Sequence, residues 1–315
     1  MSKGNLAFVF PGQGSQKVGM LAELAAEYPV VEETFAEASE VLGYDLWALV
    51  QEGPQEELNQ TERTQPLLLT SSVAIWRVWQ QLGGAQPALM TGHSLGEWSA
   101  LVCAGVVEFK DAVKTVQLRG RYMQEAVPAG EGAMAAIIGL DDEAINKACQ
   151  EAEQGEVVAA VNFNSPGQVV IAGSAAAVER AGELCKAAGA KRAMPLPVSA
   201  PFHTSLMKPA ADRLKETIDA TDYKAPETPV VHNVTAAVEN NPEAIQQLMY
   251  QQIYTPVPWV DCTKALQTAG IDTLVECGPG KVLSGLCKRI DKSLTSFASE
   301  TPADLAKALE AVAES

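Results

Sequence analysis

The sequence has no long hydrophobic segment. No apolar run approaches the roughly 18 residues that a membrane-spanning helix needs, so no membrane contact is expected. The apolar run at residues 6–10 ends at Pro11 and is too short for the core of a signal peptide. We therefore expect a cytoplasmic protein.

Cysteine pairs and positive charge are also scarce. The 6 cysteines are scattered, with no Cys-X-X-Cys pair and no Cys/His cluster at zinc-ligand spacing. This pattern predicts free thiols and no metal site.

Lys and Arg total 23 against 39 Asp and Glu, a formal net charge of −16. The acidic excess argues against a nucleic-acid partner, and an anionic ligand would need a local positive site.

The order of apolar runs along the 315 residues predicts an α/β protein. A helix with a strong apolar face is expected after the Thr-Gln-Pro at residues 64–66, and another near residues 302–312. Short continuous apolar runs predict buried strands at residues 6–10, 229–234 and 273–277.

Residues 132–198 have an order of elements of their own. Strand, helix, strand, strand, helix, strand is typical of a ferredoxin-like unit. Acidic residues at 141 and 142 are expected to cap its first helix, and Ser174 and Gly189 to cap its second. We predict a small subdomain inserted into a larger core. The subdomain comprises residues 128–198, and the core comprises residues 1–127 and 199–315.

The Gly-His-Ser-Leu-Gly motif at residues 92–96 lies between a predicted strand and a predicted helix. Gly-X-Ser-X-Gly in this context is typical of a nucleophile elbow, where a sharp turn exposes the serine hydroxyl at a helix N-terminus. The motif alone also fits an ordinary tight turn. The strand–turn–helix context on both sides favours Ser94 as a nucleophile.

A serine nucleophile needs a base, and the chain has only 3 histidines. His93 is adjacent to Ser94, where neighbouring side chains point apart, so we interpret it as structural. His232 lies in a predicted strand and is interpreted as a core histidine with satisfied hydrogen bonds. His203 follows a strand and a proline-braced loop, a common place for a catalytic histidine; a surface loop residue is the alternative. No Asp or Glu between residues 94 and 203 stands out as its partner, which leaves a backbone carbonyl as the orienting group.

The Pro-Gly-Gln-Gly loop at residues 11–14 matches neither nucleotide-binding pattern. Lys17 stands where a dinucleotide fingerprint has glycine, and the Gly-Lys-Ser/Thr end of a P-loop is missing. A loop after a strand still offers main-chain N–H groups. We expect an oxyanion hole made by the N–H of Leu95 and an N–H near Gln13.

Two arginines lie close together in a helix predicted over residues 109–126. At about 100° per residue, Arg119 falls in the middle of an apolar face and Arg121 falls on the opposite, polar face. A buried guanidinium needs a partner, either a structural carboxylate or the carboxylate of a ligand. Helix geometry alone does not separate these two alternatives.

Many motifs occur here in the order found in one family, among them "FVFPGQGSQ", "GHSLGE", "LRGRYMQEAVP", "NFNSPGQVVIAG" and "ECGPGKVL". Nearly end to end, the chain resembles the bacterial malonyl-CoA:acyl-carrier-protein transacylases of type II fatty-acid synthesis. The resemblance implies an α/β-hydrolase-like core with a ferredoxin-like subdomain and an active site between them. It also implies ping-pong transfer of malonyl from malonyl-CoA, through a Ser94 ester, to the phosphopantetheine thiol of holo acyl carrier protein. No bound cofactor is implied, and we expect a monomer.

The same resemblance assigns the remaining roles. His203 is the base, oriented by the main-chain carbonyl of Gln252; Arg119 holds the malonyl carboxylate; and Gln13 and Leu95 supply the oxyanion N–H groups. Phe202 stands where several bacterial members carry a small residue, and it is similar to the "AFH" of malonyl-selecting polyketide acyltransferases. Three alternatives follow: a polyketide-supplying malonyl transferase, a serine thioesterase or esterase, and a non-catalytic carrier-protein binding module.

The segment "GPGKVLSGLCKRIDK" offers a basic patch for an acidic carrier protein. A helix from Gly280 would place Lys281, Lys288 and Lys292 on one face, with Arg289 at its border. A merely solvated helix face is the alternative. The side of this helix expected to pack on the core comprises Val282, Leu283, Leu286 and Ile290.

Overall fold

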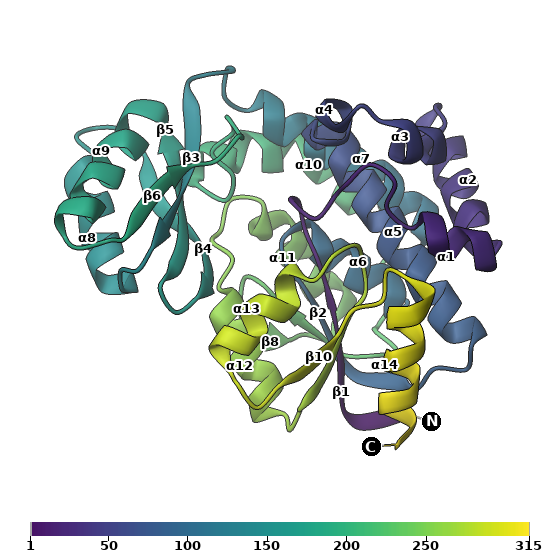
Figure 1. Ribbon diagram of the computed structural model, residues 1–315. Coiled ribbons are helices and arrows are strands. Elements are labelled where there is room, and N and C mark those ends of the chain that lie inside the picture. The colour runs from purple at the N-terminus through teal and green to yellow at the C-terminus, as the bar shows by residue number, and fades with distance from the viewer. Residues whose placement is uncertain (1, 315) are drawn as a thin grey trace.

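The computed structural model describes residues 2–314 as a mixed α/β fold with two separate sheets (Figure 1). The larger sheet has six strands in the order β10-β9-β1-β2-β7-β8, and all neighbours are parallel except β7 and β8. Its strands are β1 (Ser2–Phe10), β2 (Gln86–Gly92), β7 (Val230–His232), β8 (Ala237–Val238), β9 (Thr273–Glu276) and β10 (Thr295–Phe297).

The central strand β1 is buried on both sides of the sheet. Leu6, Phe8 and Phe10 point into the main core, whereas Ala7 and Val9 point into a second core, as the two-residue period of a strand dictates. Most helices pack on the first side, and α12 and α13 pack on the second. The helices of this body are α1 (Ala22–Glu27), α2 (Val30–Leu42), α3 (Leu46–Glu52), α4 (Gln55–Leu58), α5 (Thr61–Gln81), α6 (Leu95–Cys103), α7 (Phe109–Glu125), α10 (Lys208–Ala220), α11 (Pro242–Gln252), α12 (Trp259–Thr268), α13 (Val282–Ile290) and α14 (Pro302–Glu314), with a short 3₁₀ helix at Ser205–Met207.

The smaller sheet is antiparallel, with four strands in the order β4-β5-β3-β6. One face is covered by α8 and α9, and the other carries Met134, Val170 and Ala172 into the main core. Figure 1 shows this sheet and its two helices as a lobe beside the rest of the chain. The elements are β3 (Gly132–Ile138), α8 (Asp142–Ala152), β4 (Val158–Ser165), β5 (Gln168–Ser174), α9 (Ala175–Ala187) and β6 (Arg192–Pro195).

The capping residues of the small lobe agree in part with the sequence prediction. The Asp141 side chain accepts a hydrogen bond from the N–H of Ala144 at 2.8 Å, which confirms the N-cap of α8. Ser174 is the N-cap residue of α9, but its side chain makes no capping hydrogen bond. Gly189 follows the C-cap residue Ala188 and has φ +109°, a conformation that suits glycine.

The expected start of one long helix was wrong. Helix α5 begins at Thr61, ahead of the Thr-Gln-Pro, and holds Pro66 inside it. A proline there removes one main-chain donor, so sequence reasoning places the helix start after it. The Thr64 hydroxyl donates to the carbonyl of Gln60 at 2.9 Å and thereby strengthens the first turn.

Three further findings cover the residues that the structure describes. Within residues 2–314, none of the helices is long and apolar enough to cross a membrane. Over the same range no group of three or more His, Cys, Asp or Glu is placed to hold a metal ion. All six cysteines are buried and free, as the sequence predicted.

Candidate active site

Ser94 occupies a sharp turn between β2 and α6. Strand β2 ends at Gly92 and α6 begins at Leu95, which confirms the predicted strand–turn–helix order. Ser94 has φ 53° and ψ −111°, a backbone conformation that a non-glycine residue adopts only where its surroundings hold it. A Cβ on Gly96 would lie 2.0 Å from the carbonyl oxygen of Phe10, so only glycine allows the elbow to close against the end of β1.

The structure brings Ser94 and His203 together although 109 residues separate them. Ser94 Oγ lies 2.7 Å from His203 Nε2, and His203 Nδ1 lies 3.0 Å from the main-chain oxygen of Gln252. Burial, followed by the charge of Arg119, lowers the pKa of His203 to about 3, so the ring is neutral at pH 7. With Nδ1–H donating to the carbonyl, the Nε2 lone pair faces the Ser94 hydroxyl.

Arg119 reaches the same point from α7 and is 1% exposed. It donates to Gln65 Oε1 at 2.8 Å, to Gln252 Oε1 at 2.8 Å and to Ser94 Oγ at 3.3 Å. Its Nε has no hydrogen-bond partner within the described chain, and no carboxylate of residues 2–314 forms an ion pair with it. Burial lowers its pKa to about 10, so the guanidinium is charged at pH 7. The charge of buried Glu97 acts on the pKa of Arg119 in the opposite direction to burial, but Glu97 forms no ion pair with Arg119 among these residues.

Arg121 illustrates the opposite environment on the same helix. Its side chain is 40% exposed and pairs with Glu62 at 2.6 Å. The predicted burial of Arg119 and exposure of Arg121 are confirmed.

The expected oxyanion donors also lie at this point. Leu95 is the first residue of α6, so its N–H has no partner within the helix. Gln13 lies in the loop after β1, and its side chain donates to Thr61 Oγ1 at 3.2 Å. Both residues line the cavity above Ser94.

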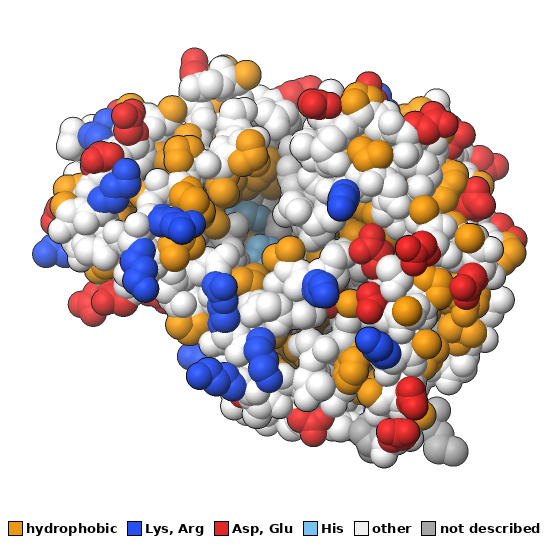
Figure 2. Space-filling view, viewed as in Figure 1, with side chains coloured by type: hydrophobic (Ala, Val, Ile, Leu, Met, Phe, Trp, Pro, Cys, Tyr) orange, Lys and Arg blue, Asp and Glu red, His pale blue; other side chains and the backbone are white. Residues whose placement is uncertain are grey.

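That cavity is small, about 120 Å³. Figure 2 shows it as a hollow between the small lobe and the larger body, with histidine at its bottom. A cavity of this volume suits a short acyl group rather than a long chain. The lining residues are Gln13, Gln65, His93, Ser94, Leu95, Arg119, Met123, Met134, Asn162, Leu196, Val198, Phe202 and His203.

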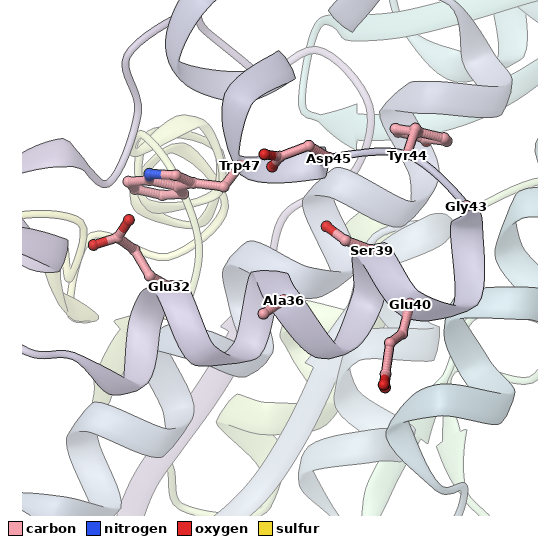
Figure 3. Close-up of a pocket in the computed structure, with 8 residues that line it drawn as sticks. All are labelled: Glu32, Ala36, Ser39, Glu40, Gly43, Tyr44, Asp45 and Trp47. Atoms are coloured by element: carbon pink, nitrogen blue, oxygen red, sulfur yellow. The ribbon is translucent and has the colours of Figure 1, made fainter.

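A larger hollow of about 650 Å³ lies elsewhere, between α2 and α3. Figure 3 shows Glu32, Glu40 and Asp45 among its residues, together with Trp47. These carboxylates would repel an anionic acyl-CoA. The residues that line this hollow include neither Ser94 nor a histidine.

Sequence reasoning missed several residues of the site. Gln65 binds Arg119, and Asn164 Oδ1 lies 2.8 Å from His93 Nε2. The interpretation of His232 as a satisfied core histidine was wrong in part. It is fully buried, but neither ring nitrogen has a hydrogen-bond partner within residues 2–314, and the nearest carboxylate oxygen, on Glu97, is 3.7 Å away. These pairings join segments far apart in sequence, which no local pattern reveals.

The four predicted docking residues are exposed but do not share one helix. Helix α13 is limited to Val282–Ile290, so Lys281 precedes it as the N-cap residue and Lys292 follows it. Lys288 Nζ donates to the main-chain oxygen of Lys292 at 2.7 Å, and Arg289 donates to Gln168 in the small lobe at 2.9 Å. The expected helix from Gly280 through Lys292 was therefore wrong.

A buried carboxylate binds the first turn of α13. Glu276 accepts hydrogen bonds from the N–H groups of Leu283 and Ser284, at 3.3 and 2.8 Å. Burial raises the pKa of Glu276 to about 7. Val282, expected to face the core, instead lies at the start of the helix and is 55% exposed.

Comparisons with known proteins identify the family of the chain. The family model described as "Acyl transferase domain" matches residues 7–306. The malonyl CoA-acyl carrier protein transacylase of Escherichia coli strain K12 is 63% identical over 96% of this chain and 98% of its own length. The enzyme of that name from Bacillus subtilis is 48% identical over 100% of this chain and 98% of its own.

Solved structures show that the similarity of this chain to these proteins includes the fold. A crystal structure of an acyl carrier protein S-malonyltransferase from Vibrio cholerae has a TM-score of 0.95 and 64% identity, covering 96% of this chain and 99% of that one. A malonyl-transacylase in complex with a holo type II PKS acyl-carrier protein has a TM-score of 0.96 and 60% identity, covering 98% and 99%. The chain therefore belongs to the acyl transferase family, within its malonyl CoA-acyl carrier protein transacylases.

Proposed function

We propose that Ser94, His203 and Arg119 transfer the malonyl group of malonyl-CoA to the phosphopantetheine thiol of holo acyl carrier protein, supplying fatty-acid elongation. The observation that carries the proposal is Arg119. A buried, charged guanidinium without a carboxylate partner in the described chain lies 3.3 Å from the serine hydroxyl. The free carboxylate of a malonyl thioester supplies that partner in bidentate form.

The first half-reaction loads the enzyme. His203 Nε2 takes the proton of Ser94 Oγ as the oxygen attacks the thioester carbonyl, and the N–H groups of Leu95 and Gln13 stabilise the oxyanion. The imidazolium keeps its Nδ1–H bond to the carbonyl of Gln252 and returns the proton to the coenzyme A sulfur as the C–S bond breaks. The product is a malonyl ester on Ser94.

The second half-reaction reverses these steps with another thiol. His203 takes the proton of the phosphopantetheine thiol, and the sulfur attacks the ester. The Ser94 oxygen leaves and recovers the proton from His203. No cofactor is needed, because each step moves only an acyl group and a proton.

The topology supports a finer description of the fold. The order β3-α8-β4-β5-α9-β6 is that of a ferredoxin-like unit, inserted into a core that contains the elbow. We assign residues 128–198 to this subdomain and residues 1–127 and 199–315 to an α/β-hydrolase-like core. We further expect a cytoplasmic monomer.

Two alternatives use the same residues. A polyketide-supplying malonyl transferase is favoured by the structural neighbour solved with a type II PKS carrier protein, and by Phe202, which lines the cavity beside the base. A thioesterase would pass the acyl group to water.

One experiment separates these functions. The protein is incubated with malonyl-CoA and then with holo carrier protein of the fatty-acid or the polyketide type, while intact masses and free malonate are followed. A malonyl ester on the wild type, absent in Ser94→Ala and transferred to the fatty-acid carrier protein, supports the proposal. Release of free malonate as the main product indicates a hydrolase. Absence of any ester indicates a non-catalytic binding module.

A further inference from the structure

Asn233, the residue directly after β7, holds the nucleophile elbow from behind. It is fully buried and absent from the cavity lining. Its Oδ1 accepts the main-chain N–H of Ser94 at 3.0 Å, and its Nδ2 donates to the carbonyl of Gly92 at 2.8 Å. We propose that Asn233 is a positioning residue that sets the backbone of Ser94, and with it the direction of the hydroxyl and of the Leu95 N–H. The inference rests on the proposed function of Ser94.

The contacts of Asn233 constrain the elbow on both sides of its turn. They fix the peptide units that join residues 92–93 and 93–94. Gln252 Nε2 donates to the carbonyl of Ser94 at 2.8 Å and fixes the next unit, which carries the Leu95 N–H. Gln252 Nε2 also lies 3.4 Å from Asn233 Oδ1, so the two amides act as one clamp. The unusual φ of 53° at Ser94 is the conformation that such a clamp would hold.

Asn233 also determines which main-chain N–H groups of the turn are free to bind the thioester oxygen. Because the Ser94 N–H is donated to Asn233, it does not point at the thioester oxygen, and that task falls to Leu95. The side chain needs one acceptor and one donor in fixed positions, which an amide supplies and a carboxylate or an alkyl group does not. Asn233 itself is held, because its N–H donates to Glu97 Oε1.

Because Asn233 does not line the cavity, its loss should slow acylation without changing acyl-group selection. We expect Asn233→Leu to load from saturating malonyl-CoA about 10–100-fold more slowly, with KM within about threefold of wild type. Loading from acetyl-CoA should fall by the same factor. Asn233→Asp keeps the acceptor for the Ser94 N–H but loses the donor to Gly92, so its rate should lie between those of wild type and Asn233→Leu.

Thr91→Val is the matched control. Thr91 is buried on β2, and its hydroxyl donates to the carbonyl of Val231 on β7 at 2.9 Å. It should lower Tm and leave the loading rate unchanged. Rapid-quench loading followed by intact mass, together with thermal unfolding, makes the comparison.

Each outcome bears on one claim. Wild-type rates in Asn233→Asp or Asn233→Leu would overturn the positioning role, as would equal slowing in Thr91→Val. If Asn233→Leu does not fold, Asn233→Asp against Thr91→Val decides the question. A wild-type protein that forms no malonyl ester would instead refute the proposed function.

Discussion

The site around Ser94 and the exposed surface near α13 hold positive charge in opposite ways. Arg119 is 1% exposed and donates its hydrogen bonds to amide and hydroxyl oxygens. Lys288 and Arg289 are exposed to water at the end of α13. A buried charge acts at short range and is hardly screened, whereas exposed charges act through a field that salt weakens. The first arrangement suits selection of an acyl group, and the second suits attraction of an acidic protein.

The largest effect is expected where the buried site loses its nucleophile or base. Ser94→Ala should abolish the malonyl ester, because it removes the oxygen that lies 2.7 Å from His203 Nε2. His203→Ala should slow loading by about 10²–10⁴-fold. Intact mass after incubation with malonyl-CoA measures both. A normal ester yield in Ser94→Ala would refute the assignment of the nucleophile.

The next effect tests whether burial makes Arg119 selective. Arg119→Ala should lose malonyl transfer by about 2–5 kcal/mol in transition-state free energy, while acetyl transfer is kept or increased. Arg121→Ala, on the exposed face of the same helix, is the control and should change neither. Steady-state rates with both acyl-CoA substrates provide the test. Equal losses for both acyl groups in a folded protein would make Arg119 structural.

A smaller effect is expected at the exposed surface. Reversing Lys288 and Arg289 to Glu should weaken transfer to carrier protein by roughly 3–10-fold at low salt, mainly through the association rate, and less at high salt. Loading of Ser94 should change much less. Reversal of Lys114 and Lys307, exposed residues of α7 and α14, makes the same change in net charge as a control. An equal fall in loading and transfer would place docking on another surface.

Phe202 should produce a change of only a few-fold. Its ring lines the cavity beside His203 and should crowd an α-methyl branch. Malonyl-CoA should therefore be preferred over methylmalonyl-CoA, and Phe202→Ser should narrow the preference about 2–5-fold, less than the roughly 10–200-fold that one methylene is worth in a closely fitted pocket. Competition between the two thioesters gives the ratio directly, and an unchanged ratio would place the selective wall elsewhere.

The smallest effect is the response of loading to pH. The pKa of His203 is lowered from its ordinary range to about 3, so the ring stays neutral and able to accept a proton as pH falls from 8 to about 5. kcat/KM for malonyl-CoA should be nearly flat over this interval. A decline in kcat/KM centred near pH 6.5 would show that neither burial nor the charge of Arg119 lowers the pKa of His203. The difference between the buried site and the exposed surface near α13 would then be smaller.

Local patterns predicted the elements that depend on short stretches of chain. The elbow at Ser94, the cap at Asp141 and the two faces of α7 follow from spacing alone, and the structure contains all three. Local patterns could not reveal that Gln65 binds Arg119 or that Asn233 binds Ser94, because each contact joins distant segments of the chain. The start of α13 was missed for a different reason: Glu276, at the end of β9, accepts a hydrogen bond from the N–H of Ser284, a contact that helical spacing does not encode.

The contact between the elbow and the end of β1 limits how such an enzyme can change. A Cβ on Gly96 would collide with the carbonyl of Phe10, and one on Gly12 would lie 2.5 Å from the carbonyl of His93. The turn at Ser94 and the segment at residues 10–14 thus approach closely at two points, so a mutation that shifts one shifts the other. New acyl specificities should therefore arise at residues that line the cavity outside this contact, such as Met134 or Phe202.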